Sequence, residues 1–441
     1  MVKQVSLILV TLVSKFIGLG REILLLGAIG VSRELDNFLF FFGISGLLMV
    51  LMASTIYTNL TPYVAKVLRG PGEDTAPPAS GDGNRTIAEL ISDSVLLGSL
   101  AALLCAAINF GLYLGLDGAG QTDGTPLLVL ALLPCMALLF NVVAEYCSAI
   151  LTARGKITPI VFGNIFISAP SILFLFLFEV TLLGYTLVFS LSYGLRAAYL
   201  LAAICWRQQT GLHLAGRFQQ GAALTGVRAV NLISGSAMTV VRLAFLAALL
   251  SSRALPEGAT TLYSYAIKIP HLYLSTVWFV LGTGFFARVV NQAGTGAFHR
   301  QVRRLIALNA GALVLGWLVL GALVSWDDLA ASALAREYAI PELARLSIWI
   351  LPAILMIPVI DMGQKVLATV DRKAEVLWIS VGIALGVAVL VPAALWAEDL
   401  RYLLLAVSIV FTVGAGISIW LLSRITPEPG HSENESAGNI G

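Results

Sequence analysis

The chain has 441 residues, of which 58% are hydrophobic and only 12% are charged, whereas soluble domains carry roughly 25% charged residues. This composition excludes a water-soluble globule and predicts an all-α polytopic membrane protein. The formal net charge of +2, with no basic run interleaved with aromatic residues, excludes a nucleic-acid-binding protein.

Twelve apolar stretches of about 20 residues or more follow one another along the chain. Each is long enough to cross a hydrocarbon core of about 30 Å as a helix, whose backbone hydrogen bonds are satisfied within the segment. The first is too long for the core of a signal peptide and contains charged residues, so we expect it to be retained. The stretches cover Val5–Ile29, Asn37–Val64, Ile87–Leu114, Pro126–Leu151, Ile157–Phe178, Leu182–Trp206, Val227–Leu250, Thr260–Ala287, Leu305–Ser325, Leu343–Val370, Val376–Trp396 and Tyr402–Leu422.

The basic residues are distributed unevenly between the two sets of connecting segments. Of the 27 lysines and arginines, 17 fall in one set of segments or at the adjoining ends of the stretches, five in or next to the other set, and five well inside the stretches. Because basic residues are retained on the cytoplasmic side, this bias predicts a multi-pass protein of the cytoplasmic (inner) membrane with both termini in the cytoplasm. Residues 425–441 are predicted to form a disordered cytoplasmic tail.

A polar segment divides the stretches into two sets of six. We expect an N-terminal half at 1–206, a cytoplasmic linker at 207–226 and a C-terminal half at 227–424. The short basic segments Leu151–Lys156 and Leu367–Lys373 resemble each other, which favours a duplication with two pseudo-symmetric halves around a central cavity. The alternative is that two short basic turns arose independently.

Ionisable side chains inside the stretches are the candidate functional residues, because each costs about 2.5–3.5 kcal/mol at the membrane centre on insertion scales and usually faces a cavity. Five are basic and three are acidic. They are Lys15, Arg21, Glu22, Glu145, Arg196, Arg242, Lys268 and Asp361. Stretches 1, 7 and 8 supply four of the cations and one acid, which predicts an anion-binding cavity. The alternative is a set of structural salt bridges. The predicted cavity cations are Lys15, Arg21, Arg242 and Lys268.

The other charged residues are assigned separate roles. Glu145 and Asp361 are candidates for proton or sodium coupling, although pairing with Arg196 or another buried cation is slightly favoured. Glu22 and Arg196 are candidates for helix pairing or gating, as is Asp36. Asp36 lies at the outer end of the second stretch, where we expect it to be more exposed and to cap the helix.

The sequence lacks the motifs of soluble-enzyme chemistry. It contains no GxxxxGK[ST] phosphate loop, no HExxH and no G-x-S-x-G, and its four cysteines show no CxxC spacing. We therefore expect a transporter without catalytic residues, cofactor or metal. An integral-membrane polysaccharide polymerase or glycosyltransferase remains an alternative, for which Trp326–Glu342 is the longest outer loop.

Several motifs resemble those of the MurJ/MviN lipid II flippases. Ser14–Glu22 (SKFIGLGRE) and Ala28–Phe38 (AIGVSRELDNF) are similar to the family's S-R-x-x-G-x-x-R-[DE] and F-G-x-[ST]-x-x-x-D-A-F. Leu255–Gly258 (LPEG) with Tyr265–Lys268 (YAIK) is similar to its L-P-x-G…Y-A-x-[RK] segment, and Gly282–Gly284 with Arg288 continues the likeness. The resemblance implies the fold of the multidrug/oligosaccharidyl-lipid/polysaccharide exporter superfamily.

The resemblance also implies roles in lipid-diphosphate handling for Lys15, Arg21, Asp36 and Lys268. Two positions depart from the family pattern. Leu47–Leu51 replaces an arginine pair, and Val241-Arg242 replaces an Asp-Arg pair. The family generally has fourteen helices, whereas twelve are predicted here. These departures leave open whether the substrate is lipid II or another lipid-linked oligosaccharide.

Together these patterns predict a flippase that moves a polyprenyl-diphosphate-linked saccharide by alternating access, without ATP. The expected partners are that lipid, the bilayer and glycosyltransferases or polymerases of the same pathway. The alternative within the superfamily is a cation-coupled drug exporter, which would require an acid-dominated cavity.

Overall fold

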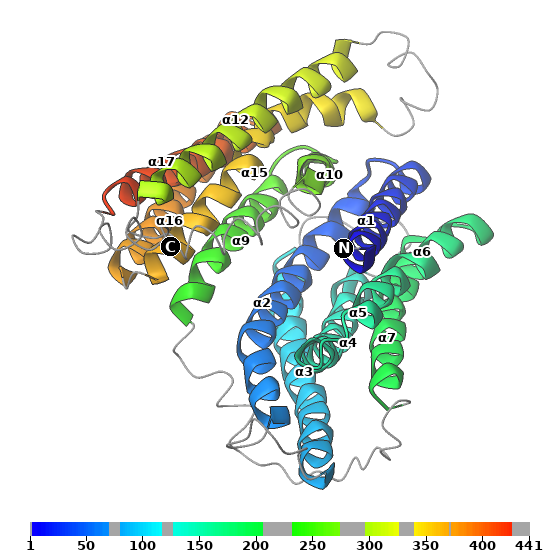
Figure 1. The fold of residues 1–441 in the computed structure, drawn as a ribbon. Coiled ribbons are helices and arrows are strands. Elements are labelled where there is room, and N and C mark those ends of the chain that lie inside the picture. The colour runs from blue at the N-terminus through cyan, green and yellow to red at the C-terminus, as the bar shows by residue number, and fades with distance from the viewer. Residues whose placement is uncertain are drawn as a thin grey trace, which may run out of the picture. The chain divides into compact units, whose positions relative to one another are not determined.

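The computed structural model describes residues 2–69, 80–116, 127–205, 232–273, 296–325, 339–369 and 372–425. Within these ranges all regular secondary structure is helical, which confirms the predicted all-α class (Figure 1). The chain divides into two compact units, Met1–Leu232 and Ile233–Gly441. The predicted linker at 207–226 and residues 426–441 of the predicted tail lie outside the described residues.

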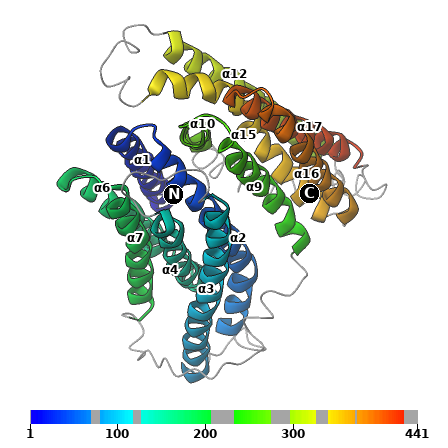
Figure 2. The ribbon, with the colours of Figure 1, turned by 180° about the vertical axis from the view of Figure 1, so that it is seen from behind.

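Each unit holds helices from six of the predicted stretches, and Figure 2 shows them from behind. Unit 1 contains α1 (Val2–Ile29), α2 (Arg33–Arg69), α3 (Ser80–Leu116), α4 (Leu127–Ala153), α5 (Thr158–Gly163), α6 (Ile165–Leu177) and α7 (Leu182–Cys205). Unit 2 contains α9 (Leu232–Ser252), α10 (Ala259–Tyr273), α12 (Gly296–Ser325), α15 (Ile340–Thr369), α16 (Lys373–Leu395) and α17 (Leu400–Ser423). Among the described residues, nine segments are long and apolar enough to cross a membrane. The chain is a multi-pass membrane protein.

One helix lies at the centre of each unit. In unit 1, α4 packs against α2, α3 and α7, and in unit 2, α15 packs against α10, α12 and α17. Helix α4 is apolar on nearly all sides, as a helix surrounded by others must be. Small residues let its neighbours approach closely, as is common between membrane helices. Gly98 of α3 is one such small residue. Its backbone lies directly against Leu139 of α4.

We expect Gly98→Ala to destabilise unit 1. A Cβ atom at Gly98 would lie 2.9 Å from Leu139 Cδ1 and 3.0 Å from the Leu139 carbonyl oxygen, and overpacking of this kind costs about 1–3 kcal/mol. Gly111 on the same helix is the matched control, because a Cβ atom there would meet nothing within 4 Å. Gly111→Ala should be neutral or slightly stabilising. Thermal unfolding in detergent distinguishes the two, and equal midpoints would contradict the expectation.

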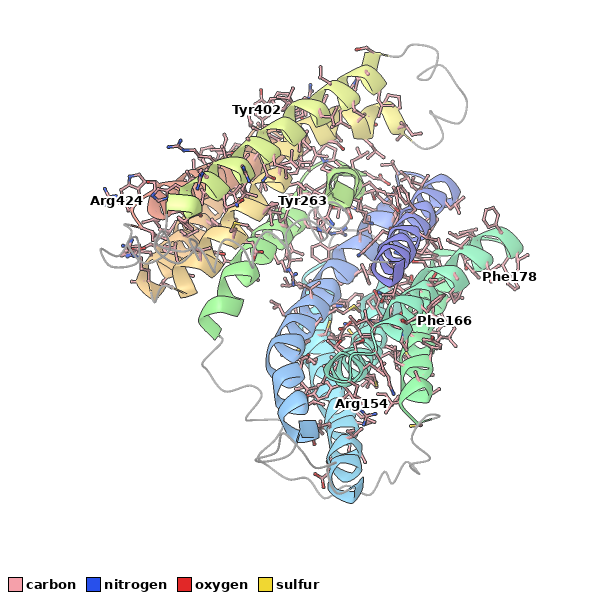
Figure 3. All side chains as sticks on the ribbon, viewed as in Figure 1. Arg154, Phe166, Phe178, Tyr263, Tyr402 and Arg424 are labelled. Atoms are coloured by element: carbon pink, nitrogen blue, oxygen red, sulfur yellow. The ribbon has the colours of Figure 1, made fainter. Side chains whose placement is uncertain are left out.

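The central helices of the two units are each followed by a backbone hydrogen bond of the same i→i−5 span. The Lys156 N–H donates to the Leu151 carbonyl at 2.8 Å, and the Arg372 N–H donates to the Leu367 carbonyl at 2.8 Å. In the first turn Gly155 has a φ of +68°, the left-handed conformation that favours glycine after a helix. Figure 3 labels Arg154, which immediately precedes this glycine. The matching closures are what a duplicated six-helix unit would produce.

Several helices extend a few residues beyond the predicted stretches, as α3 does from Ile87 back to Ser80, and two further differences have a clear local reason. The fifth stretch is divided at Asn164 into α5 and α6, where the Ile167 N–H bonds to the Asn164 carbonyl in a tighter i→i+3 pattern. Helix α12 begins at Gly296, nine residues before the predicted start at Leu305. Its first turns are amphipathic. Phe298, Val302 and Leu305 are buried on one face, whereas Arg300, Arg303 and Arg304 are exposed.

Candidate functional site

The best-defined buried charge in unit 1 is Arg196 on α7. Its Nη1 lies 2.8 Å from Glu145 Oε1 and donates to Asn141 Oδ1 at 3.0 Å. Asn141 and Glu145 are four residues apart on α4, so both side chains leave the same face of that helix. The side chains of Arg196 and Glu145 are only 6% and 13% exposed. This contact is the pairing with Arg196 that the sequence offered as an alternative to ion coupling.

Arg21 on α1 is also buried against other helices of unit 1. Its guanidinium forms an ion pair with the neighbouring Glu22, and its Nη1 donates to the Ile167 carbonyl of α6 at 3.5 Å. The Cζ atom lies 4.5 Å from the centroid of the Phe189 ring on α7, a cation–π contact. Arg21 thus links α1 to α6 and α7.

Aromatic residues on α7 connect these two ion pairs. Tyr185, Phe189 and Tyr193 follow at intervals of four residues, with ring centroids 5.9 Å and 5.4 Å apart in succession. Tyr193 lies within electrostatic range of Arg21, Glu22, Glu145 and Arg196. Tyr193 therefore interacts electrostatically with members of both ion pairs, so the two pairs are neighbours in unit 1.

Lys15 lies on the same helix as Arg21 but is exposed within unit 1. It is within electrostatic range of Arg196, so the two like charges repel each other. The unit 1 charge cluster therefore contains three cations and two acids. The five residues are Lys15, Arg21, Glu22, Glu145 and Arg196.

The expectation for Asp36 is wrong in two respects. Asp36 is 3% exposed, hence buried, and the helix is capped by Ser32, whose Oγ accepts from the Leu35 N–H at 3.3 Å. The next residue, Asn37, is 1% exposed, and neither polar atom of its amide has a hydrogen-bond partner among the described residues. Asn37 was not among the predicted site residues, because nothing in a single sequence distinguishes a buried asparagine from one at a helix end.

Unit 2 contains a smaller set of ionisable residues. Asp361 on α15 interacts electrostatically with Arg242 on α9, and Lys268 Nζ lies 4.4 Å from the centroid of the Tyr265 ring on α10. The Leu255–Gly258 motif forms the turn that starts α10. Gly258 has a φ of +87° there, and its carbonyl accepts from the Leu262 N–H. Figure 3 labels Tyr263 on this helix, and its hydroxyl donates to the Phe245 carbonyl of α9 at 3.2 Å.

Asp93 on α3 is a further acidic residue that the predicted set does not include. It is 8% exposed and lies within electrostatic range of Tyr146 on α4. The apolar segment Ile87–Gly115 has 29 residues, or about 43 Å of helix at 1.5 Å per residue, which exceeds the core thickness of about 30 Å. Asp93 is six residues from one end of that segment and so lies near the membrane boundary.

The predicted site residues thus fall into two groups, one in each unit. In unit 1 the structure pairs Arg21 with Glu22 and Arg196 with Glu145, and Lys15 is within electrostatic range of Arg196. In unit 2 Arg242 and Asp361 interact electrostatically. Convergence of Lys15, Arg21, Arg242 and Lys268 on one cavity stays a prediction. Among the described residues, no group of three histidine, cysteine or acidic side chains could hold a metal ion.

Comparison with known proteins identifies the fold. No family model and no curated protein sequence matches the chain, but solved structures match it over nearly its whole length. The lipid II flippase MurJ in an inward closed conformation matches with a TM-score of 0.69 and 14% identity, over 95% of this chain and 87% of that chain. An inward-facing multidrug resistance MATE family transporter matches with a TM-score of 0.59 and 14% identity, over 95% of this chain and 93% of that chain.

A third structure belongs to the same superfamily. It is a MOP superfamily transporter from Pyrococcus furiosus, described as having a binding pocket of reverse polarity. It matches with a TM-score of 0.56 and 14% identity, over 95% of this chain and 94% of that chain. This chain has the fold of the MOP superfamily transporters. The fold is the one that the sequence motifs implied, and these structures belong to transporters rather than enzymes.

Proposed function

We propose that this protein is a flippase that moves the head group of a polyprenyl-diphosphate-linked saccharide across the cytoplasmic membrane by alternating access. The charge balance of the candidate residues carries this proposal. The candidate residues comprise five cations, Lys15, Arg21, Arg196, Arg242 and Lys268, against four acids, Glu22, Asp36, Glu145 and Asp361. This leaves one excess positive charge, and an anionic substrate such as a diphosphate diester makes that excess favourable inside a membrane.

The sequence motifs and the fold support the same substrate class. The segments around Arg21 and Lys268 resemble the lipid II flippases, and the lipid II flippase MurJ matches the fold with a TM-score of 0.69. The saccharide is lipid II or the unit of an exported polysaccharide, with the prenyl tail left in the bilayer. Enzymes that build or polymerise that saccharide are the partners that this function requires.

The membrane potential can drive this movement. The sequence has no phosphate-binding loop for ATP, and an inside-negative potential favours outward movement of anions by about 2.3 kcal/mol per charge per 100 mV. A diphosphate gains roughly twice that amount if the protein cations do not move with it.

Reconstitution tests the proposal. Purified protein in liposomes, with an imposed potential and no ATP, is expected to translocate a fluorescent prenyl-diphosphate disaccharide, and translocation should follow the sign of the potential. Empty liposomes and the neutral prenyl-alcohol disaccharide are the controls. Absence of both binding and movement of the diphosphate lipid would refute the proposal.

The second candidate is a cation-coupled drug exporter. The match to MATE transporters over 93–94% of their length favours it. Against it, the Glu145 carboxylate is 2.8 Å from Arg196 and Asp361 interacts with Arg242, so neither acid dominates its surroundings. Export of organic cations in the same liposomes, with no response to the diphosphate lipid, would establish this candidate instead.

A further inference from the structure

The two ends of α17 carry arginines in opposite electrostatic situations. At the first end, the Asp399 carboxylate caps the helix by accepting from the Arg401 N–H at 2.8 Å, and it also contacts the Arg401 guanidinium at 2.9 Å. Burial raises the pKa of the Asp399 carboxyl, but these hydrogen bonds and the Arg401 charge lower it more, so its pKa falls below the ordinary value. The charge of Arg401 is therefore neutralised locally.

At the other end, Arg424 follows the last turn of α17 and is exposed. Its Cζ lies 3.8 Å from the centroid of the Trp420 ring, one turn earlier on the same helix. No acidic side chain in the described part of the chain forms an ion pair with Arg424. The Trp420 ring covers one face of the Arg424 guanidinium. The N–H groups along the edge of the guanidinium remain free to donate two parallel hydrogen bonds to a ligand.

A second arginine lies beside the first. Arg372, in the turn after α15, donates from Nη2 to the Arg424 carbonyl at 3.5 Å, while its Nη1 lies 3.4 Å from Glu375 Oε1. The side chains of Arg372 and Glu375 are 35% and 30% exposed, so this ion pair is weak and partly solvated. Arg372 therefore has a partly solvated acidic partner, and it lies next to the backbone of Arg424.

Aromatic residues occur at both ends of α17, but the excess charge occurs at only one. Trp396 is 90% and Tyr402 is 54% exposed near the first end, and Trp420 is 51% exposed near the second. Figure 3 labels Tyr402 and Arg424, which belong to these two ends. Exposed tryptophan and tyrosine are enriched at the level of lipid head groups at both membrane surfaces. Arg424 and Arg372 therefore lie at head-group depth, where phosphate is the most abundant anion.

We propose that Arg424, Arg372 and Trp420 form a binding site for the head-group phosphate of an anionic phospholipid at the cytoplasmic leaflet. The Trp420 ring lies among the upper acyl chains, and the Arg424 fork binds the phosphodiester oxygens bidentately, with Arg372 as the second cation. The contact of Arg372 with the Arg424 carbonyl is explained by capping of the α17 C-terminus. Capping does not explain why the Arg424 guanidinium is exposed and stacked on Trp420. This site is independent of the proposed transport function.

Native mass spectrometry of the full-length protein with phosphatidylglycerol tests the site. Arg424→Gln and Trp420→Leu are each expected to weaken retention of phosphatidylglycerol by roughly tenfold, because each removes one charge-assisted or stacking contact. Arg401→Gln is the matched control at the other end of the same helix, and it should leave retention unchanged. Phosphatidylcholine, whose choline cation offsets its phosphate, should be retained more weakly than phosphatidylglycerol by the wild type, and its retention should fall less in each variant.

Two results would overturn the proposal. Equal phosphatidylglycerol retention by the wild type, Arg424→Gln and Trp420→Leu would remove the site. Displacement of the lipid by millimolar inorganic phosphate would show that the arginines bind a soluble phosphate rather than a head group. Unfolding midpoints in detergent identify any variant that fails to fold, and Arg424→Lys then serves as the second variant. It keeps the charge but loses the bidentate fork, so intermediate retention is expected.

Discussion

Lys268→Gln is expected to abolish transport of the diphosphate lipid while leaving the protein folded in the membrane. The side chain is partly exposed on α10, with its Nζ 4.4 Å from the Tyr265 ring centroid, so its replacement leaves little buried space. It is one of the two candidate cations of unit 2, with Arg242. A hydrogen bond to a charged group contributes about 1.5–3 kcal/mol, which corresponds to roughly a ten- to hundredfold loss of affinity.

The measurements are lipid binding and potential-driven translocation in liposomes. Lys268→Arg is the conservative variant and should retain much of the activity, because it keeps the charge. Arg401→Gln removes a cation of the same chain at the surface end of α17 and should transport normally. Unchanged translocation by Lys268→Gln would remove this residue from the substrate site.

Glu145→Ala is expected to produce the largest loss of stability among single substitutions in unit 1. The Arg196 guanidinium is 6% exposed and has Glu145 as its ion-pair partner at 2.8 Å. Removal of one member of a buried pair leaves the other charge uncompensated, at a cost of about 3–5 kcal/mol. Thermal unfolding in detergent should therefore show a midpoint many degrees lower than that of the wild type.

Two comparisons separate this effect from a general loss of charge. Glu375→Ala breaks the half-exposed pair with Arg372 and should cost only about 0–1 kcal/mol. The double variant Glu145→Leu with Arg196→Met should recover most of the lost stability, because it removes both buried charges. If the double variant is stable yet inactive, the Glu145–Arg196 pair has a role in transport. If it is stable and active, the pair is structural.

The fold was predictable from the sequence largely because membrane spans are the strongest local signal. A continuous apolar run needs no knowledge of its neighbours, so each predicted stretch contains a helix of the structure. The extension of α12 to Gly296 was missed because its signal is periodic rather than continuous. Phe298 and Val302 face inward while Arg303 faces outward, and a hydropathy average over such turns is low.

The candidate site was predictable as a set of residues but not as an arrangement. The cost of burying charge identified Arg196 and Glu145 as residues of interest, yet their contact joins positions 51 residues apart. No local pattern encodes that contact. Asn37 and Asp93 were missed for a different reason. Asn37 is uncharged, so the cost of burying charge does not single it out. Asp93 lies near the end of its span, where an acidic side chain is ordinarily solvated.

The Arg196–Glu145–Asn141 contacts have a consequence for the energetics of a transport cycle. All three side chains belong to α4 and α7 of unit 1, so a rigid-body displacement of one unit against the other would stretch none of them. The free energy of removing these side chains from water is part of the folding free energy of unit 1. It therefore does not contribute to the barrier between conformational states of the two units. In the proposed alternating-access mechanism, the bonds that stabilise unit 1 are therefore not the ones that movement between the units would break.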